Sequence, residues 1–174
     1  LVFEDALRER VALLKGLPQD QLATVYEKRV RLNPGAKALV QTMRKDGALT
    51  ALVSGGFTYF TGRVAAETGF DIVQANELHI AGGKLLGTVA EPILGREAKR
   101  ALLVRLARER SIPLGATLAV GDGANDLDMI RASGLGVAYH AKPVVAAAAA
   151  ARIDHGDLRA LLFLQGYAAA EIAG

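Results

Sequence analysis

Short apolar segments that end in glycines or polar residues alternate with amphipathic segments along most of the chain. Segments 48–56, 115–120 and 135–140 are almost entirely apolar, which is typical of strands buried on both faces. The amphipathic segments 57–69, 94–112 and 125–134 favour helices. Strands that alternate with helices in this way form a parallel sheet, because each helix returns the chain to the same end of the sheet. The sequence therefore predicts an α/β fold with a parallel sheet flanked by helices.

Two parts of the chain depart from this alternation. Residues 1–31 contain only helical patterns, with Phe3 and Val11 on one apolar face, and we expect them to lie outside the sheet. Residues 32–174 are predicted to form the α/β core. Within that core, alternating residues on both sides of Gly82-Gly83 predict a β-hairpin at about 72–89. The alanine-rich segment 142–151 is predicted to be helical, since alanine has the highest helix propensity.

Composition excludes several classes of function. Half of the 174 residues are apolar, so one domain with a sizeable core is expected. The net charge is only +3 and no basic tract carries aromatic residues, which argues against nucleic-acid binding. No apolar run reaches about 18 residues, so no membrane span is predicted. The absence of cysteine excludes disulfides and thiolate metal sites and is compatible with a cytoplasmic protein.

The segment "GDGAND" (121–126) carries two carboxylates directly after a predicted buried strand. One aspartate at the start of a helix would be ordinary capping. Asp122, Asp126 and Asn125 together with two glycines suggest instead a site for a hard cation such as Mg²⁺, which takes a few carboxylates and completes its shell with water and phosphate oxygens. The segment lacks the third glycine of a dinucleotide-binding loop and the ligand spacing of a calcium loop.

A second glycine-rich turn, Ser54-Gly55-Gly56, follows another predicted strand. Ligands bind beyond the carboxyl ends of such strands, so both turns are expected to face one crevice. Small residues here would let backbone amides approach a phosphate closely. The alternative is a tight turn in which Ser54 lies near the N-cap of the next helix.

Further candidates come from helices. Lys99 is either a surface lysine or a cation that neutralises a phosphate. Arg10 lies near the edge of the apolar face that contains Phe3, so it is either a packed surface arginine or a cation for a substrate carboxylate. The three histidines are isolated and none is assigned to catalysis, and Tyr59 and Phe60 are expected in the core.

"LVSGGFTYF", Lys99 and "VGDGANDLDMI" together resemble three motifs of the haloacid-dehalogenase-like phosphatases. The resemblance extends over nearly the whole chain and is closest to the phosphoserine phosphatases of that family, through "VQANELHIAGGKLLG" and "GDGANDLDMIRASGLGVAYHAKP". It implies a Rossmann-like core with a partial helical cap at residues 1–31. It also implies Mg²⁺-dependent hydrolysis of phosphoserine through an aspartyl-phosphate, as the last step of serine biosynthesis.

The resemblance assigns a role to each candidate residue. Asp122 would bind Mg²⁺, and Asp126 would orient Lys99 or the metal-bound water. Lys99 would stabilise charge on the phosphoryl group. The substrate would be held by Ser54, Gly55, Asn125, Phe3 and Arg10, with Ser54 and the Gly55 amide on phosphate oxygens and Arg10 on the serine carboxylate.

The sequence departs from the family in one respect. The family's DxDxT/S motif, which carries the nucleophilic aspartate on the first, central strand, does not occur in these 174 residues. We therefore expect this segment to lack that strand, to fold poorly alone and to be inactive alone. Two alternatives stay open: a phosphatase for another small phosphorylated metabolite, and a non-catalytic scaffold of the same fold. The expected binding partner is a small phosphorylated substrate, and a homodimer is one possible oligomeric state.

Overall fold

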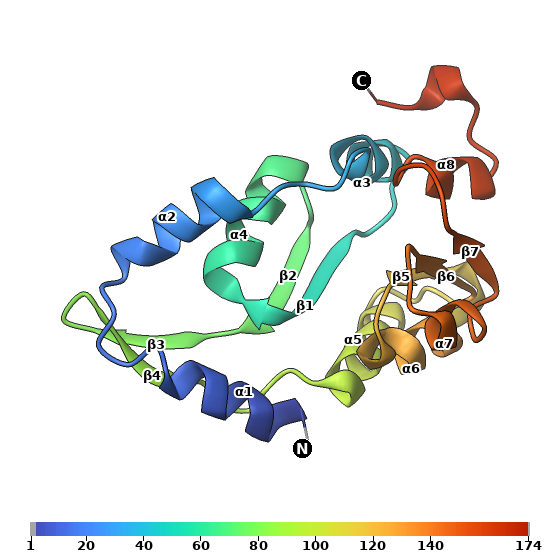
Figure 1. The fold of residues 1–174 in the computed structure, drawn as a ribbon. Coiled ribbons are helices and arrows are strands. Elements are labelled where there is room, and N and C mark those ends of the chain that lie inside the picture. Colours follow the sequence, from blue (N-terminus) through green and yellow to red (C-terminus); the bar gives the residue numbers. More distant parts are fainter. Residues whose placement is uncertain (1–2, 174) are drawn as a thin grey trace. The chain divides into compact units, whose positions relative to one another are not determined.

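The computed structural model describes residues 3–173, which form two compact units (Figure 1). The first unit contains residues up to Ile93 together with the segment from Leu161 onward, and the second contains Leu94–Ala160. Parallel strands accompanied by helices occur in both units, so the predicted α/β class is confirmed. None of the helices described here has the length and apolar character that crossing a bilayer requires.

The first unit combines a parallel strand pair with a hairpin and several helices. Its elements are α1 (Phe3–Ala12), α2 (Asp20–Arg29), α3 (Ala36–Lys45), β1 (Ala51–Phe57), α4 (Thr58–Thr68), β2 (Ile72–Asn76), β3 (Leu78–Ala81), β4 (Lys84–Val89) and, near its end, α8 (Ala160–Leu164). β1 and β2 pair in parallel, whereas β3 and β4 form an antiparallel hairpin. The hairpin is thus shorter than the predicted 72–89, because residues 72–76 pair with β1 instead.

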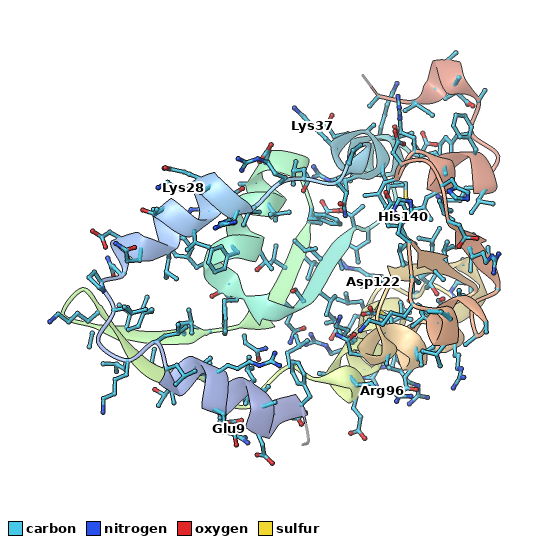
Figure 2. The ribbon with its side chains drawn as sticks, in the orientation of Figure 1. Glu9, Lys28, Lys37, Arg96, Asp122 and His140 are labelled. Carbon is cyan, nitrogen blue, oxygen red and sulfur yellow. The ribbon has the colours of Figure 1, made fainter. Side chains whose placement is uncertain are left out.

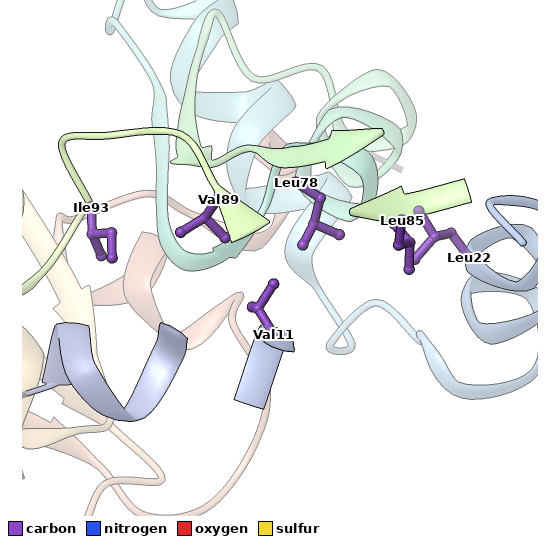
Figure 3. Close-up of a cluster of buried hydrophobic side chains, with 6 residues drawn as sticks. All are labelled: Val11, Leu22, Leu78, Leu85, Val89 and Ile93. Atoms are coloured by element: carbon purple, nitrogen blue, oxygen red, sulfur yellow. The ribbon is translucent and has the colours of Figure 1, made fainter. Parts of the chain in front are cut away.

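The hairpin turn and the core next to it follow from local chemistry. Gly82 and Gly83 both have positive φ, 56° and 72°, the conformation that a two-residue hairpin turn with the strand twist requires. α1 lies along β4 (Figure 1) and buries Val11 against Leu78, Leu85 and Val89 (Figure 3). Tyr59 and Phe60 pack against the same cluster, as predicted.

The second unit is a three-stranded parallel sheet with its helices. Its elements are α5 (Arg96–Glu109), β5 (Leu118–Gly121), the short 3-10 turn η2 (Ala124–Asp126), α6 (Leu127–Ala132), β6 (Leu135–Tyr139), α7 (Pro143–Ala146) and β7 (Ala151–Ile153). The strand order is β5-β6-β7. α6 packs on β5 and β6, and its Leu127 and Ile130 are buried with Val145.

The helix predicted over 142–151 is mostly wrong. α7 covers only Pro143–Ala146, and β7 begins at Ala151, which pairs with Val137 of β6. Helix propensity is a weak preference that strand pairing overrides. The chain must leave the helix early to reach the edge of β6.

Strand pairing also bears on the expected missing strand. Among residues 3–173, β1 pairs with β2 alone and β5 pairs with β6 alone. The expectation of a further central strand stays a prediction. The division into a cap segment, 1–31, and a core, 32–174, also stays a prediction; residues 1, 2 and 174 of those ranges lie outside the described residues.

Asp71 ties the beginnings of β1 and β2 together. Its carboxylate accepts hydrogen bonds from the Thr50 backbone N–H at 2.9 Å, the Thr50 hydroxyl at 2.8 Å and Arg44 Nε at 2.8 Å. Burial alone would raise the pKa of Asp71, but the bonds from Thr50 and the charge of Arg44 outweigh burial, and the pKa lies below its ordinary value.

Asp71→Asn is therefore expected to lower the free energy of unfolding at pH 7 by about 1–2 kcal/mol. A depressed pKa stabilises the fold above the unfolded-state pKa of about 3.9, and that contribution is lost as pH falls through the folded value. The gap between variant and wild type should thus close in acid, as measured by urea unfolding of the protein expressed from its complete gene from pH 7 to pH 3. Asp20→Asn, at an exposed position of α2, is the control. A gap that stays constant with pH would contradict this account.

Candidate functional site

Lys99 and Asp126 form a buried ion pair in the second unit. Lys99 Nζ donates to Asp126 Oδ1 at 2.6 Å, and the two residues are only 6% and 5% exposed. A lysine buried to this degree is rare unless it is paired. The alternative of a surface lysine on α5 is therefore wrong, and the predicted association of Asp126 with Lys99 is present.

The second oxygen of Asp126 holds the turn that follows β5. Oδ2 accepts hydrogen bonds from the backbone N–H groups of Asp122 at 3.2 Å and Gly123 at 3.1 Å. A Cβ on Gly121 would lie 2.7 Å from this Oδ2 and closer still to the rest of the side chain. Glycine at 121 thus makes room for the carboxylate, which joins α5 to the turn.

Asp122 lies beyond the end of β5 with an exposed side chain (Figure 2). Its backbone is held by Asp126 and by Lys142, whose N–H donates to the Asp122 carbonyl at 3.1 Å. Its carboxylate makes no hydrogen bond or ion pair with residues 3–173. The side chain of Asn125 lies over Gly123 in the same turn.

This donor set fits Mg²⁺ bound through one protein carboxylate. Within residues 3–173, no three acidic, histidine or cysteine side chains gather into a group that could hold a metal unaided. Mg²⁺ needs no such cage, because it keeps several waters and binds through one or two carboxylates plus phosphate oxygens. A fixed backbone with a free carboxylate at Asp122 meets that requirement.

Ser54, Gly55 and Gly56 form a turn within the end of β1 in the first unit. Ser54 Oγ accepts a hydrogen bond from the Gly56 N–H at 3.0 Å. The N-cap of α4 is Phe57, so the alternative of Ser54 near the N-cap position is wrong. Because this turn and the Asp122 turn belong to different units, the expectation that they face one crevice stays a prediction.

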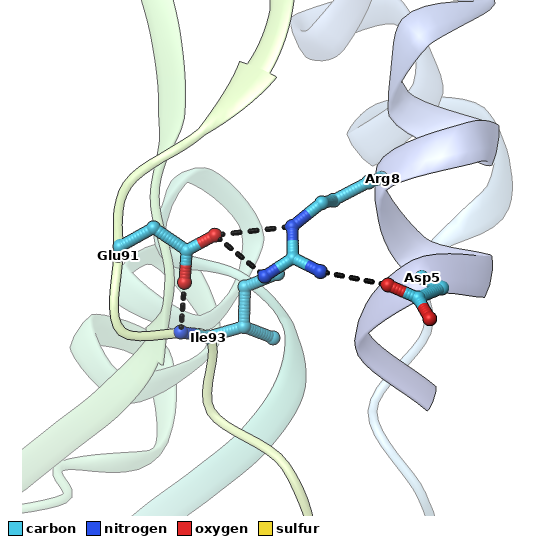
Figure 4. Close-up of polar contacts among 4 residues, drawn as sticks. All are labelled: Asp5, Arg8, Glu91 and Ile93. Carbon is cyan, nitrogen blue, oxygen red and sulfur yellow. Dashed lines mark hydrogen bonds and ion pairs between the residues drawn. The ribbon is translucent and has the colours of Figure 1, made fainter. Parts of the chain in front are cut away.

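Phe3 and Arg10 occupy α1, in the first unit. Phe3 is 40% exposed and lies outside the cluster that Leu7, Val11 and Leu14 join. Arg10 is exposed and makes no ion pair within the described residues. The neighbouring Arg8 is engaged instead: it donates to Glu91 at 2.9 and 3.1 Å and to Asp5 at 2.9 Å (Figure 4). Arg10 is thus free to bind an anion, whereas Arg8 is not.

The sequence reasoning missed a second link between α5 and α6. Arg96 donates to both oxygens of Asp128 at 2.5 Å, one turn of α5 before Lys99. These hydrogen bonds lower the pKa of Asp128 below its ordinary value. A signal was present in the spacing. Arg96 and Lys99 are three residues apart on one helix, and Asp126 and Asp128 are two residues apart, so an Arg96–Asp128 pair can form beside the Lys99–Asp126 pair.

Comparison with known proteins defines the class. Residues 2–131 match the family model for haloacid dehalogenase-like hydrolases. A phosphoserine phosphatase of Streptomyces coelicolor is 45% identical over 99% of this chain, and one of Polaromonas is 43% identical over 93%. A solved structure of a probable phosphoserine phosphatase from Vibrio cholerae, in unliganded form, has a TM-score of 0.90 with 41% identity over 93% of this chain.

A second solved structure, a phospho-aspartyl intermediate analogue of phosphoserine phosphatase, has a TM-score of 0.87 with 38% identity over 94% of this chain. Because the family model matches 130 of the 174 residues, the chain belongs to the haloacid dehalogenase-like hydrolase family. It spans 42% of the Streptomyces relative, 70% of the Polaromonas relative, and 50% and 78% of the two structures.

Proposed function

We propose that the protein hydrolyses O-phosphoserine to serine and phosphate through an aspartyl-phosphate. One observation carries this proposal: the buried Lys99–Asp126 pair ties α5 to the turn that exposes the free carboxylate of Asp122. A scaffold without catalysis has no need to bury an ion pair at that point, since breaking such a pair is costly and forming it is seldom stabilising. The name shared by the Streptomyces and Polaromonas relatives supports the choice of substrate.

In the proposed reaction, an aspartate carboxylate oxygen attacks phosphorus while the bond from phosphorus to the serine oxygen breaks. That oxygen leaves with a proton from the second aspartate of the DxDxT/S motif. The same residue takes a proton from the water that then hydrolyses the acyl phosphate to phosphate and the free carboxylate. The attacking aspartate belongs to the DxDxT/S motif, which residues 1–174 do not contain. The expectation that these residues alone are inactive therefore remains part of the proposal.

The residues of this chain serve charge and orientation. Lys99 stabilises negative charge on the phosphoryl group, and Asp126 fixes the ammonium through its 2.6 Å contact. Ser54 and the Gly55 amide hold phosphate oxygens, and Asn125 binds near them. Mg²⁺ at Asp122, when bound, supplies neutralising charge to the phosphate. The proposal includes a cytoplasmic location. No step of the proposed reaction depends on the oligomeric state of the protein.

The test uses the protein expressed from its complete gene, assayed on a panel of phosphomonoesters with Mg²⁺ and after chelation. Phosphoserine is expected to give the highest kcat/KM, and chelation is expected to abolish turnover. Preference for another small phosphorylated metabolite would keep the class and reject the substrate. No turnover of any phosphomonoester would favour the scaffold alternative. Residues 1–174 expressed alone should show no turnover.

Arg10→Ala is expected to raise KM for phosphoserine about tenfold or more, because a charged hydrogen bond to the substrate carboxylate is lost. KM for a phosphomonoester without a carboxylate should change by less than about twofold, since that substrate makes no such bond. Arg8→Ala is the matched control on the same helix, and it should not discriminate between the substrates because Arg8 is bound to Glu91 and Asp5. An equal rise in both KM values for Arg10→Ala would remove Arg10 from this role.

A further inference from the structure

The turn Ser54–Gly56 is a bulge in β1 that one buried side chain closes. Val53 pairs with Gln74 and Phe57 pairs with Asn76, so three residues of β1 lie opposite the single residue Ala75 of β2. Two extra residues must therefore leave the ladder, and their backbone groups need other partners.

Asn76 supplies one of those partners. Its side-chain Nδ2 donates to the Gly55 carbonyl at 2.9 Å, and the residue is only 3% exposed. The N–H of Gly56, which belongs to the same peptide unit as that carbonyl, donates to Ser54 Oγ at 3.0 Å. The Gly55–Gly56 peptide is thus held at both its oxygen and its nitrogen.

This double attachment determines how the bulge presents its donors. A peptide between two glycines rotates more freely than any other, because neither residue has a Cβ to restrict it. With the peptide held, Ser54 Oγ accepts from Gly56 and keeps its own proton to donate to an anion. Rotation of the peptide would release Ser54 and move the neighbouring Gly55 N–H.

We propose that Asn76 is a positioning residue for phosphate binding: its buried amide holds the Gly55–Gly56 peptide and, through it, the Ser54 hydroxyl and the Gly55 N–H. The proposal rests on the proposed function, in which these two donors bind phosphate oxygens. Asn76 itself does not touch the substrate. The effect should therefore appear in phosphate affinity rather than in the chemical step.

Asn76→Leu keeps the approximate size of the side chain and removes the donor. In the protein expressed from its complete gene, we expect KM for phosphoserine and the inhibition constant of inorganic phosphate both to rise about tenfold, as when one hydrogen bond to a charged group is lost. The change in kcat should be smaller. Thr50→Val is the matched control, because it removes a hydrogen bond between the same two strands at their opposite end. It should change neither constant by more than about twofold.

Equal effects of Asn76→Leu and Thr50→Val, or none from Asn76→Leu, would overturn the proposal. If Asn76→Leu does not fold, Gly56→Ala tests the same peptide, since the new Cβ would lie 3.1 Å from Ser54 Oγ and require that oxygen to shift by a few tenths of an ångström. An unchanged phosphate inhibition constant in Gly56→Ala would also overturn it. The wild-type protein is assayed first. If it neither turns over phosphomonoesters nor binds phosphate, the proposed function itself is rejected before any variant is tested.

Discussion

In the protein expressed from its complete gene, Lys99→Met is expected to lower the free energy of unfolding by about 3–5 kcal/mol and to abolish the proposed phosphatase activity. The loss of stability arises because Asp126 would keep its negative charge in a site that is 5% exposed, with no cation to compensate. The loss of activity arises because the phosphoryl group would lose the positive charge that Lys99 is proposed to supply. Unfolding in urea, followed by circular dichroism, measures the first effect, and steady-state kinetics the second.

A double-mutant cycle separates the pair from its surroundings. Asp126→Asn alone leaves Lys99 buried without its anion and should also be strongly destabilising, whereas Lys99→Met with Asp126→Asn buries no charge. The double variant should therefore be more stable than the sum of the single losses implies, by about 1–3 kcal/mol. Arg152→Met, which breaks an exposed ion pair with Asp154 in the same unit, should cost less than about 1 kcal/mol. Strict additivity of the Lys99 and Asp126 losses would show that the pair does not interact as described.

Gly121→Ala is expected to lower the free energy of unfolding by about 3 kcal/mol, although it adds only one methyl group. The new methyl group would lie 2.7 Å or less from Asp126, including the Cβ of that residue, which no rotation of the side chain can move away. Asp126 would have to shift and would lose Lys99 and the turn amides together.

Gly115→Ala provides the control, because a Cβ there meets no atom within 4 Å. Its free energy of unfolding should lie within about 0.5 kcal/mol of wild type. Both variants are compared by urea unfolding, and Gly121→Ala should also lose turnover. Similar stability of the two variants would mean that the Asp126 turn tolerates displacement.

Most elements were predictable because the local signals agreed with the tertiary contacts. The segment 94–112 has helical spacing over its whole length, and α5 occupies most of it. The Gly82-Gly83 turn was readable because two positive φ angles in a hairpin turn select glycine. The alanine segment failed for the opposite reason: its propensity favoured a helix, but Ala151 pairs with Val137 in the sheet.

The candidate site divides in the same way. Asp122, Asp126, Lys99 and Ser54 were identifiable from their residue types after strands and from the family motifs. For Arg96 and Asp128 the only signal was their spacing beside Lys99 and Asp126. Asn76 had none, because its partner Gly55 lies 21 residues away in sequence. No local pattern encodes such a contact.

The sequence by itself determined most of the order of strands and helices, the residue types of the two turns and membership of a hydrolase family. Only the tertiary structure decided which of two nearby arginines is free, since Glu91 engages Arg8 and leaves Arg10 unpaired. It also decided that Lys99 is buried against Asp126 and that Asn76 holds the Gly55–Gly56 peptide. The physical reason is common to all three: hydrogen-bond partners distant in the chain are selected by packing, which brings donors and acceptors together only after the strands and helices have assembled.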